Sequence, residues 1–259
     1  MPINHKFLQT NFGNGFETHN AILDVTPDYQ PDVLFIGTFN HGWEWNPAEF
    51  FYGRTYFWPI FGNLANNNPN QFGNNDWPGL ENIWEYCAQF KISFADIVKG
   101  TNRFAITQQN ELMELVEVTS NNLDVPYIWK GYSDNQLNFL GGSNCLSDNV
   151  CHIIEYLQKT PSITRIYFTW KLDNSWLSLL AHQIVNTDFD RQISFESILS
   201  PSGNGFGNLI PGYPSKIKSI MHSWVWVNHP NANPEYPREG FSYFNHEWLE
   251  IAGVQIGLF

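Results

Sequence analysis

The 259-residue sequence contains few cysteines, few charged residues and no long apolar run. Its three cysteines include no CxxC pair, and this number cannot by itself supply a four-cysteine metal centre or a fully paired disulfide framework. No stretch approaches the roughly 18 consecutive apolar residues of a membrane-spanning helix. The first six residues lack the apolar segment of a signal peptide. We therefore expect a soluble protein of the reducing cytoplasm, with no membrane attachment.

Positive charge is scarce as well. The chain has 13 Lys and Arg against 25 Asp and Glu, which gives a formal net charge of −12. Because phosphate neutralisation needs clustered basic side chains, this balance disfavours a protein that grips nucleic acid through a generally basic surface. The acids are unevenly spread, since residues 104–158 hold seven acids and one base. Six basic residues near predicted strand ends can still form a local patch facing DNA: Arg54, Lys99, Arg103, Lys171, Lys216 and Lys218.

Hydrophobic residues make up 42% of the chain and aromatic residues 17%, which is enough for a large core and excludes an intrinsically disordered chain. Four apolar runs bounded by turn residues predict strands buried on both faces, at 32–37, 92–97, 163–169 and 193–199. Helical patterns cover 56–64, 80–90, 150–157, 176–185 and 214–226. This alternation predicts an α/β fold, a three-layer α/β/α sandwich with a central four-stranded, mostly parallel sheet.

Three regions interrupt the alternation. Residues 104–145 carry a short acidic helical pattern followed by an irregular segment rich in Gly, Asn and Ser, which we interpret as an insertion. Residues 62–79 contain seven Asn and predict a loop. From about residue 228 the chain is rich in Pro and aromatic residues, which indicates a C-terminal extension that wraps the body. We expect a single domain over residues 1–259.

Polar residues follow the predicted strands at the edge where open parallel sheets bind their ligands, beyond the carboxyl ends of the strands. This rule selects residues 37–42, 96–103, 169–173 and 200–208. Asp96 ends an otherwise apolar strand, where a carboxylate is costly unless another group uses it. Asp96 therefore either contacts a ligand or has a structural role. In the structural role it caps a loop or pairs with Arg103.

The fragments in these regions are GTFNHG at 37–42, FFYGRTYFW at 50–58, FADIVKG at 94–100, IYFTWK at 166–171 and SPSG at 200–203. Together they resemble the uracil-DNA glycosylase superfamily, closest to its mismatch-specific uracil/thymine and hypoxanthine branches. Those proteins carry a Gly-led loop after the first strand and an aromatic pair before a Phe-Trp helix start. They also carry an apolar strand ending in Asp or Asn, and a Pro-Ser-Gly loop after the last strand. The resemblance covers roughly residues 32–103 and 159–226.

The resemblance implies a DNA glycosylase-like protein that flips a deaminated or mismatched base, such as uracil or hypoxanthine, into a pocket and hydrolyses its N-glycosidic bond. No cofactor and no metal are implied. In this interpretation Asn40 positions the attacking water and His41 donates a hydrogen bond to the base or to a phosphate. Tyr52 or Phe51 supplies a stacking face, and Asp96 accepts a hydrogen bond from the base.

The same resemblance assigns further residues to substrate binding. Gly37 and Phe39 belong to the Gly-led loop beside the base. The hydroxyl groups of Ser200 and Ser202 reach phosphate oxygens, and Gly203 lets backbone amides approach a phosphate closely. The implied partner is DNA that contains a damaged or mismatched base, and we expect the protein to act as a monomer.

Two departures from the family pattern leave an alternative open. The mismatch-specific branch has Asn two positions after the first Gly of its loop, where this chain has Phe39. The hypoxanthine branch has Asn between its aromatic pair and the Phe-Trp. In this chain the corresponding connection, residues 53–56, is two residues shorter and contains no Asn. A catalytically inactive module that binds a nucleobase or nucleic acid on the same fold is therefore the alternative. A metal-dependent hydrolase is disfavoured, because the eight His form no HExxH motif.

Overall fold

The structure is a computed structural model that describes residues 29–40, 51–52, 55–73, 76–101, 134–202, 216–225 and 239–255. Four strands form the central sheet: β1 (Val33–Gly37), β2 (Ile92–Asp96), β5 (Arg165–Phe168) and β6 (Ser194–Ser197). Their order is β2-β1-β5-β6 and every neighbouring pair is parallel. The four predicted strands and their parallel arrangement are confirmed.

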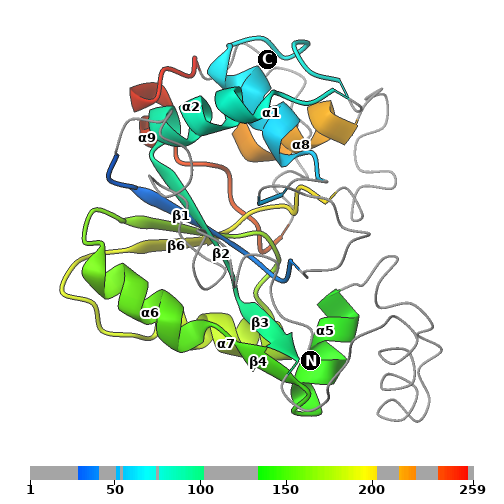
Figure 1. The fold of residues 1–259 in the computed structure, drawn as a ribbon, viewed down its shortest axis with the longest axis vertical. Helices are drawn as coiled ribbons and strands as arrows, with labels where there is room; N and C mark the ends of the chain where they lie inside the picture. The colour runs from blue at the N-terminus through cyan, green and yellow to red at the C-terminus, as the bar shows by residue number, and fades with distance from the viewer. Residues whose placement is uncertain are drawn as a thin grey trace.

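Helices cover both faces of this sheet (Figure 1). One layer contains α1 (Phe57–Ala65), α2 (Leu80–Phe90), α8 (Lys216–Val225) and α9 (His246–Ile251). The other contains α5 (Asp134–Gly142), α6 (Val150–Lys159) and α7 (Trp176–Val185). The buried side chains divide into two clusters, one on each side of β1, because successive strand residues point to opposite faces. The predicted three-layer α/β/α sandwich is therefore confirmed.

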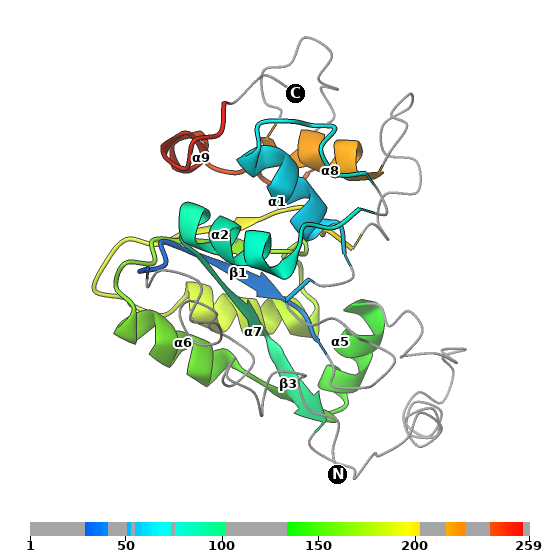
Figure 2. The same cartoon turned by 45° about the horizontal axis from the view of Figure 1, so that its top comes forward.

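The region predicted to be irregular before residue 145 differs from that expectation. It contains α5, and just beyond it β4 (Leu146–Asp148) pairs antiparallel with β3 (Val98–Thr101). The apolar run at 92–98 spans two strands, because the backbone leaves the main sheet at Ile97, whose carbonyl accepts a hydrogen bond from the Asn149 amide at 2.8 Å. Both views place β3 beside α5, past the carboxyl end of β1 (Figures 1 and 2). The predicted acidic helix near 111–116 lies outside the described residues.

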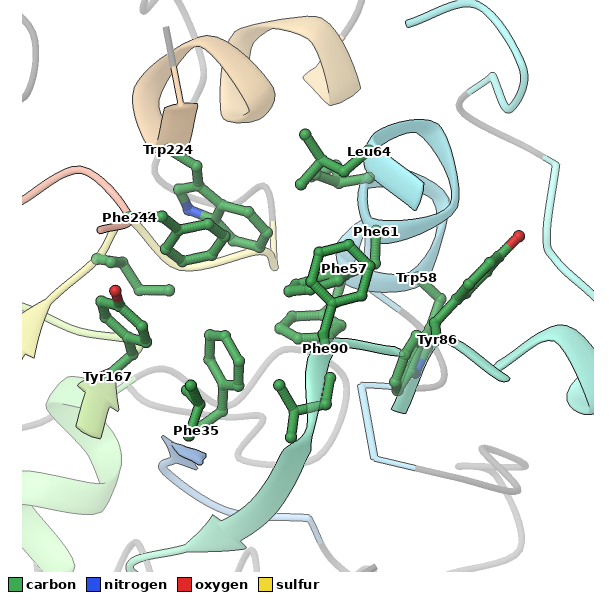
Figure 3. Close-up of a cluster of buried hydrophobic side chains, with 14 of the residues drawn as sticks. Phe35, Phe57, Trp58, Phe61, Leu64, Tyr86, Phe90, Tyr167, Trp224 and Phe244 are labelled. Carbon is green, nitrogen blue, oxygen red and sulfur yellow. The ribbon is translucent and has the colours of Figure 1, made fainter. Parts of the chain in front are cut away.

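The larger core cluster is dominated by aromatic rings that surround Phe35 of β1 (Figure 3). The Phe35 side chain is fully buried, and its ring centroid lies 5.1 Å from that of Phe57 and 5.4 Å from that of Tyr167. Phe61, Phe94, Phe244 and Trp248 complete its aromatic neighbours. Edge-to-face and offset contacts of this kind contribute beyond the burial of apolar area. They fasten α1 and the C-terminal segment to the middle of the sheet.

The described part of the C-terminal segment is built into this core. The Ser242 amide donates to the Ser197 carbonyl at 2.7 Å, which extends the hydrogen bonding of β6, and the Phe244 amide donates to the Trp224 carbonyl at 2.7 Å. The Tyr167 hydroxyl accepts a hydrogen bond from the Asn245 amide at 2.9 Å. Burial raises the pKa of Tyr167 well above its usual value. The side chains of this segment therefore close one face of the sheet.

Replacing Phe35 tests the importance of this aromatic core. We expect Phe35→Ala to lower the free energy of unfolding by about 3–5 kcal/mol, because it leaves a cavity that six surrounding rings cannot fill. Denaturant unfolding followed by circular dichroism measures the change. Leu179→Ala, at a position 55% exposed on α7, is the control and should stay within about 0.5 kcal/mol of the wild type. Similar losses for both variants would show that Phe35 is not at the centre of the core.

Candidate functional site at the carboxyl ends of the strands

The strand order places a crevice-forming position beside the carboxyl end of β1. Within this sheet the chain passes from β1 to β2, which lies on one side of β1. From β5 it passes to β6, which lies on the opposite side of the β1–β5 pair. Connections that diverge in this way define the position where open α/β sheets bind ligands. The loops are tied together there, because the Thr169 amide and hydroxyl both donate to the Ile36 carbonyl, at 3.1 and 3.3 Å.

Three of the predicted site residues meet at this edge: Gly37, Tyr52 and Asp96. Gly37 is the last residue of β1 and is in register with Asp96, the last residue of β2. A Cβ atom added to Gly37 would overlap a carboxylate oxygen of Asp96 and would lie 3.0 Å from the Tyr52 hydroxyl oxygen. The absence of a side chain at position 37 therefore allows a carboxylate and a phenol hydroxyl to come together at the end of the sheet.

Tyr52 reaches this position through an unusual backbone conformation. Its φ of 57° lies in the left-handed region, which bulky residues rarely adopt. Neighbouring contacts hold the turn: the Tyr52 carbonyl accepts from the Thr55 amide at 3.1 Å and from the Thr55 hydroxyl at 3.0 Å. On the other side, the Phe51 carbonyl accepts from the Trp58 indole N–H at 2.6 Å. The Tyr52 ring stacks on Phe57, with centroids 4.6 Å apart.

Phe51, the other candidate for a stacking face, is 1% exposed and its ring stacks on Phe94 of β2 at 5.6 Å. It is a core residue, so it offers no free face to a base. Tyr52 keeps part of its surface in solvent although its hydroxyl oxygen is buried. Of the two predicted aromatic residues, Tyr52 alone has the position that a ligand contact needs.

Asp96 is 4% exposed, and the backbone on either side of its carboxylate is firmly held. The Asn149 side-chain amide donates to the Asp96 carbonyl at 3.0 Å. The Ile97 amide donates to the Gly37 carbonyl at 2.9 Å, and the Val98 amide donates to the Thr38 carbonyl at 3.0 Å. These bonds continue the pairing of the β1 and β2 backbones past the strand ends, and they fix the direction in which the Asp96 side chain leaves the sheet.

The loop after β6 adjoins the same turn. The Tyr56 amide, one residue before α1, donates to the Pro201 carbonyl at 2.9 Å. The Ser200 hydroxyl donates to the Ser202 hydroxyl at 3.0 Å, and the Ser202 amide donates to Ser200 Oγ at 3.3 Å. Pro201 is buried, Ser200 is half-buried and Ser202 is exposed. The two serine hydroxyls therefore stand beside the start of α1 with access to solvent, whereas Gly203 lies outside the described residues.

The remaining predicted residues, Phe39, Asn40 and His41, come after β1 in the chain. Phe39 packs against the cluster of the α5–α7 layer, on the opposite face of the sheet from Tyr52. Asn40 is half-buried at the end of the described loop, and His41 lies outside the described residues. The structure thus brings Gly37, Tyr52 and Asp96 together, links them through the Tyr52 turn to the Ser200 loop, and directs Phe39 elsewhere.

Sequence reasoning missed α5, whose first residue adds a carboxyl group near the β1 loop. The Asp134 carboxyl group interacts with the Thr38 hydroxyl, directly after Gly37. Partial desolvation by the surrounding protein raises the pKa of Asp134, and repulsion from the Asp173 carboxylate adds to the increase. The pKa of Asp173 is lowered by hydrogen bonding from the Ser175 side chain first, and then by hydrogen bonds from the Ser175 amide and the Ser178 hydroxyl. No motif in the sequence marks Asp134, because its neighbour Thr38 is far away along the chain.

Within the described ranges, no group of three or more His, Cys, Asp or Glu is arranged to hold a metal ion. In the same part of the chain, no helix has the length and apolar character needed to cross a membrane. All three thiols are free, with Cys87 and Cys145 buried and Cys151 exposed. Burial raises the pKa of the Cys87 thiol well above its usual value, which keeps it protonated and unreactive.

Comparison with known proteins adds one likeness. No family model matches the chain, and no curated protein matches it. A solution structure described as a "putative Uracil DNA glycosylase" from Methanosarcina acetivorans is similar over 76% of this chain and 90% of that chain. The two sequences are 12% identical and the TM-score is 0.38. This degree of likeness carries no argument about activity.

Filling the space at Gly37 tests the geometry of the site. We expect Gly37→Ala to lower the free energy of unfolding by about 1–3 kcal/mol, because its methyl group must displace the Asp96 carboxylate. Gly142→Ala is the matched control, since a Cβ there meets no atom within 4 Å. Placed at the end of α5, the control should be neutral or stabilising by up to about 1 kcal/mol. Equal denaturation midpoints for Gly37→Ala and the wild type would contradict the close approach of Asp96.

Proposed function

We propose that this protein is a DNA glycosylase-like enzyme that excises a deaminated or mismatched base, such as uracil or hypoxanthine, by hydrolysing its N-glycosidic bond. The observation that carries the proposal is the meeting of the Asp96 carboxylate and the Tyr52 hydroxyl at Gly37, at the carboxyl ends of adjacent parallel strands. The sequence resemblance supports the same assignment, with the mismatch-specific and hypoxanthine branches of the uracil-DNA glycosylase superfamily as the nearest groups.

The residue types suit recognition of a base taken out of the DNA stack. A flipped base needs an aromatic or apolar surface and hydrogen-bonding groups on its edge. An ionised Asp96 accepts hydrogen bonds only, so it selects a base edge that presents an N–H donor. Tyr52 supplies a hydroxyl that donates or accepts, within 3.0 Å of the place where a Gly37 side chain would be. Uracil and hypoxanthine both present a ring N–H next to a carbonyl, which matches this acceptor and donor pair.

The chemistry needs a water aligned with the sugar and stabilisation of negative charge on the departing base. An ionised Asp96 opposes that negative charge, so other groups must donate the hydrogen bonds that stabilise the departing base. Tyr52 and His41 are the proposed donors. Asn40, three residues beyond Gly37, is the proposed residue for positioning the water. Ser200, Ser202 and Gly203 are proposed to contact the DNA backbone and to hold the flipped nucleotide in place.

A catalytically inactive base-binding module is the second candidate. It is favoured by the packing of Phe39 against the core cluster of the α5–α7 layer, because the position that carries Asn in the mismatch-specific branch here carries a partly buried apolar ring. Under this alternative the Asp96 and Tyr52 groups still recognise a base, while no residue aligns the water.

Incision of oligonucleotides tests the proposal. Duplexes that carry uracil, hypoxanthine, xanthine or mismatched thymine are incubated with the protein and treated with alkali, which breaks the strand at an abasic site. We expect Asn40→Ala to lower excision by about 10²-fold or more with little loss of DNA binding, since it removes a contact made in the transition state. Asn68→Ala, an exposed residue beyond the C-terminal end of α1, is the control and should keep wild-type activity.

Wild-type protein that binds these duplexes but incises none of them would support the inactive module. Equal activity of Asn40→Ala and the wild type would move the role of positioning water to another residue, His41 first.

Exchange of the carboxylate for an amide tests how the base is read. We expect Asp96→Asn to change the ratio of kcat/KM values between the lesion bases by roughly tenfold or more, because an amide also donates where a carboxylate only accepts. Asp190→Asn is the control, since Asp190 is exposed and lies on the loop that enters β6 from the amino end of the sheet. If Asp96→Asn lowers kcat/KM for every base by the same factor, Asp96 does not select the base.

A further inference from the structure

Two long stretches of this acidic chain contain no acidic residue. None of the 25 Asp and Glu lies within residues 50–75 or within residues 197–234. Together the two stretches make up about a quarter of the sequence, and they contain Arg54, Lys216 and Lys218. Outside them the negative charge is high enough to give the whole chain a net charge of −12.

The fold brings the described parts of both stretches together. Helix α1 comes from the first stretch and α8 from the second, and they pack against each other in one layer, side by side in both views (Figures 1 and 2). The Tyr56 amide bonds to the Pro201 carbonyl, and the Trp224 indole N–H donates to the Leu199 carbonyl at 2.8 Å. The start of α1, helix α8 and the loop after β6 are therefore neighbours in the fold.

Lys216 has a defined place in this region. It is exposed at the first position of α8, and its ammonium nitrogen lies 6.0 Å from the centre of the Tyr56 ring. An ammonium group over an aromatic face gains a modest attraction and gives up few conformations when it binds an anion. Tyr56 is bonded to the loop that carries the exposed Ser202 hydroxyl and the half-buried Ser200 hydroxyl. A cation, two hydroxyl groups and an aromatic ring thus share one surface, which we call the acid-free face: Tyr56, Ser200, Ser202 and Lys216.

We infer that the acid-free face binds the sugar-phosphate backbone of DNA, with Lys216 in direct contact with a phosphate. The inference rests on the proposed function, because it supplies the path by which DNA reaches Asp96 and Tyr52. A polyanion approaching a protein of net charge −12 is repelled by most of the surface, so its closest approach is favoured where acids are absent. Hydroxyl and ammonium groups are the usual donors to phosphate oxygens, which favours a nucleic acid backbone as the partner.

The salt dependence of DNA binding tests this face. Fluorescence anisotropy of a labelled, undamaged duplex gives the binding constant over a series of KCl concentrations. We expect Lys216→Gln to weaken binding and to reduce the slope of log K against log[salt] by about one unit, since one phosphate contact is lost. Lys159→Gln is the matched control, because Lys159 is an exposed lysine at the end of α6, paired with Glu155, and its loss changes the net charge equally.

A second variant separates binding from folding. Lys216→Glu reverses the charge in the first turn of α8, where the helix dipole favours an acidic residue. It should therefore bind DNA more weakly than Lys216→Gln while its free energy of unfolding is unchanged or higher. Equal salt slopes for the wild type and Lys216→Gln would overturn the inference, as would an equal loss of slope in Lys159→Gln or a failure of the wild type to bind DNA. Equally strong competition by polyglutamate would indicate an acidic polypeptide as the partner and would also overturn it.

The incision assay on the same proteins distinguishes this inference from the proposed function. Loss of salt slope in Lys216→Gln, with no base excised by the wild type, supports the acid-free face and contradicts the glycosylase activity. Base excision by the wild type, with an unchanged slope in Lys216→Gln, supports the activity and contradicts the assignment of Lys216.

Discussion

The Asp96 carboxylate and the Tyr52 hydroxyl approach the space that a side chain at position 37 would occupy. Because Gly37 has no Cβ, a carboxylate from β2 and a phenol from the turn before α1 can both come close to the end of β1. The surrounding backbone is organised around this contact. Asn149 holds the Asp96 carbonyl, and Thr55 holds the carbonyl of Tyr52 in its left-handed conformation. A side chain at position 37 would separate the polar groups that the proposed function brings together.

The aromatic core gives this arrangement its rigidity. Tyr52 stacks on Phe57, and Phe57 lies against Phe35 in the middle of the sheet, so the position of the hydroxyl is set by packing that extends through the molecule. Rings in such contact move little, because protein interiors are packed as densely as organic crystals. Phe244 and Trp248 of the C-terminal segment complete the same cluster, which makes that segment part of the scaffold beneath the site.

The sheet could be predicted because its strands are short, continuous apolar runs, and Gly37 and Asp96 followed from the rule that ligands bind at the carboxyl ends of such strands. Tyr52 was predicted as a site residue only through the family resemblance, and the positive φ that positions it could not be predicted, since this residue type does not favour it. Helix α5 was missed because its sequence has few apolar residues and depends on contacts from elsewhere. Asn138 accepts a hydrogen bond from the Leu177 amide at 2.8 Å, and Gly141 leaves room for the Trp176 ring. The opposite direction of Phe39 is likewise set by tertiary packing.

Nuclear magnetic resonance of isotopically labelled protein, titrated with uracil and with hypoxanthine, tests most directly whether the carboxyl ends of β1 and β2 form a base-binding site. We expect the amide resonances of Gly37, Tyr52 and Asp96 to shift on addition of at least one of these bases. We expect no shift at Asp32 and Lys91, which pair with each other at the amino ends of the same strands. Shifts confined to the amino ends, or no shift at Gly37 with either base, would contradict a base-binding site at the carboxyl ends.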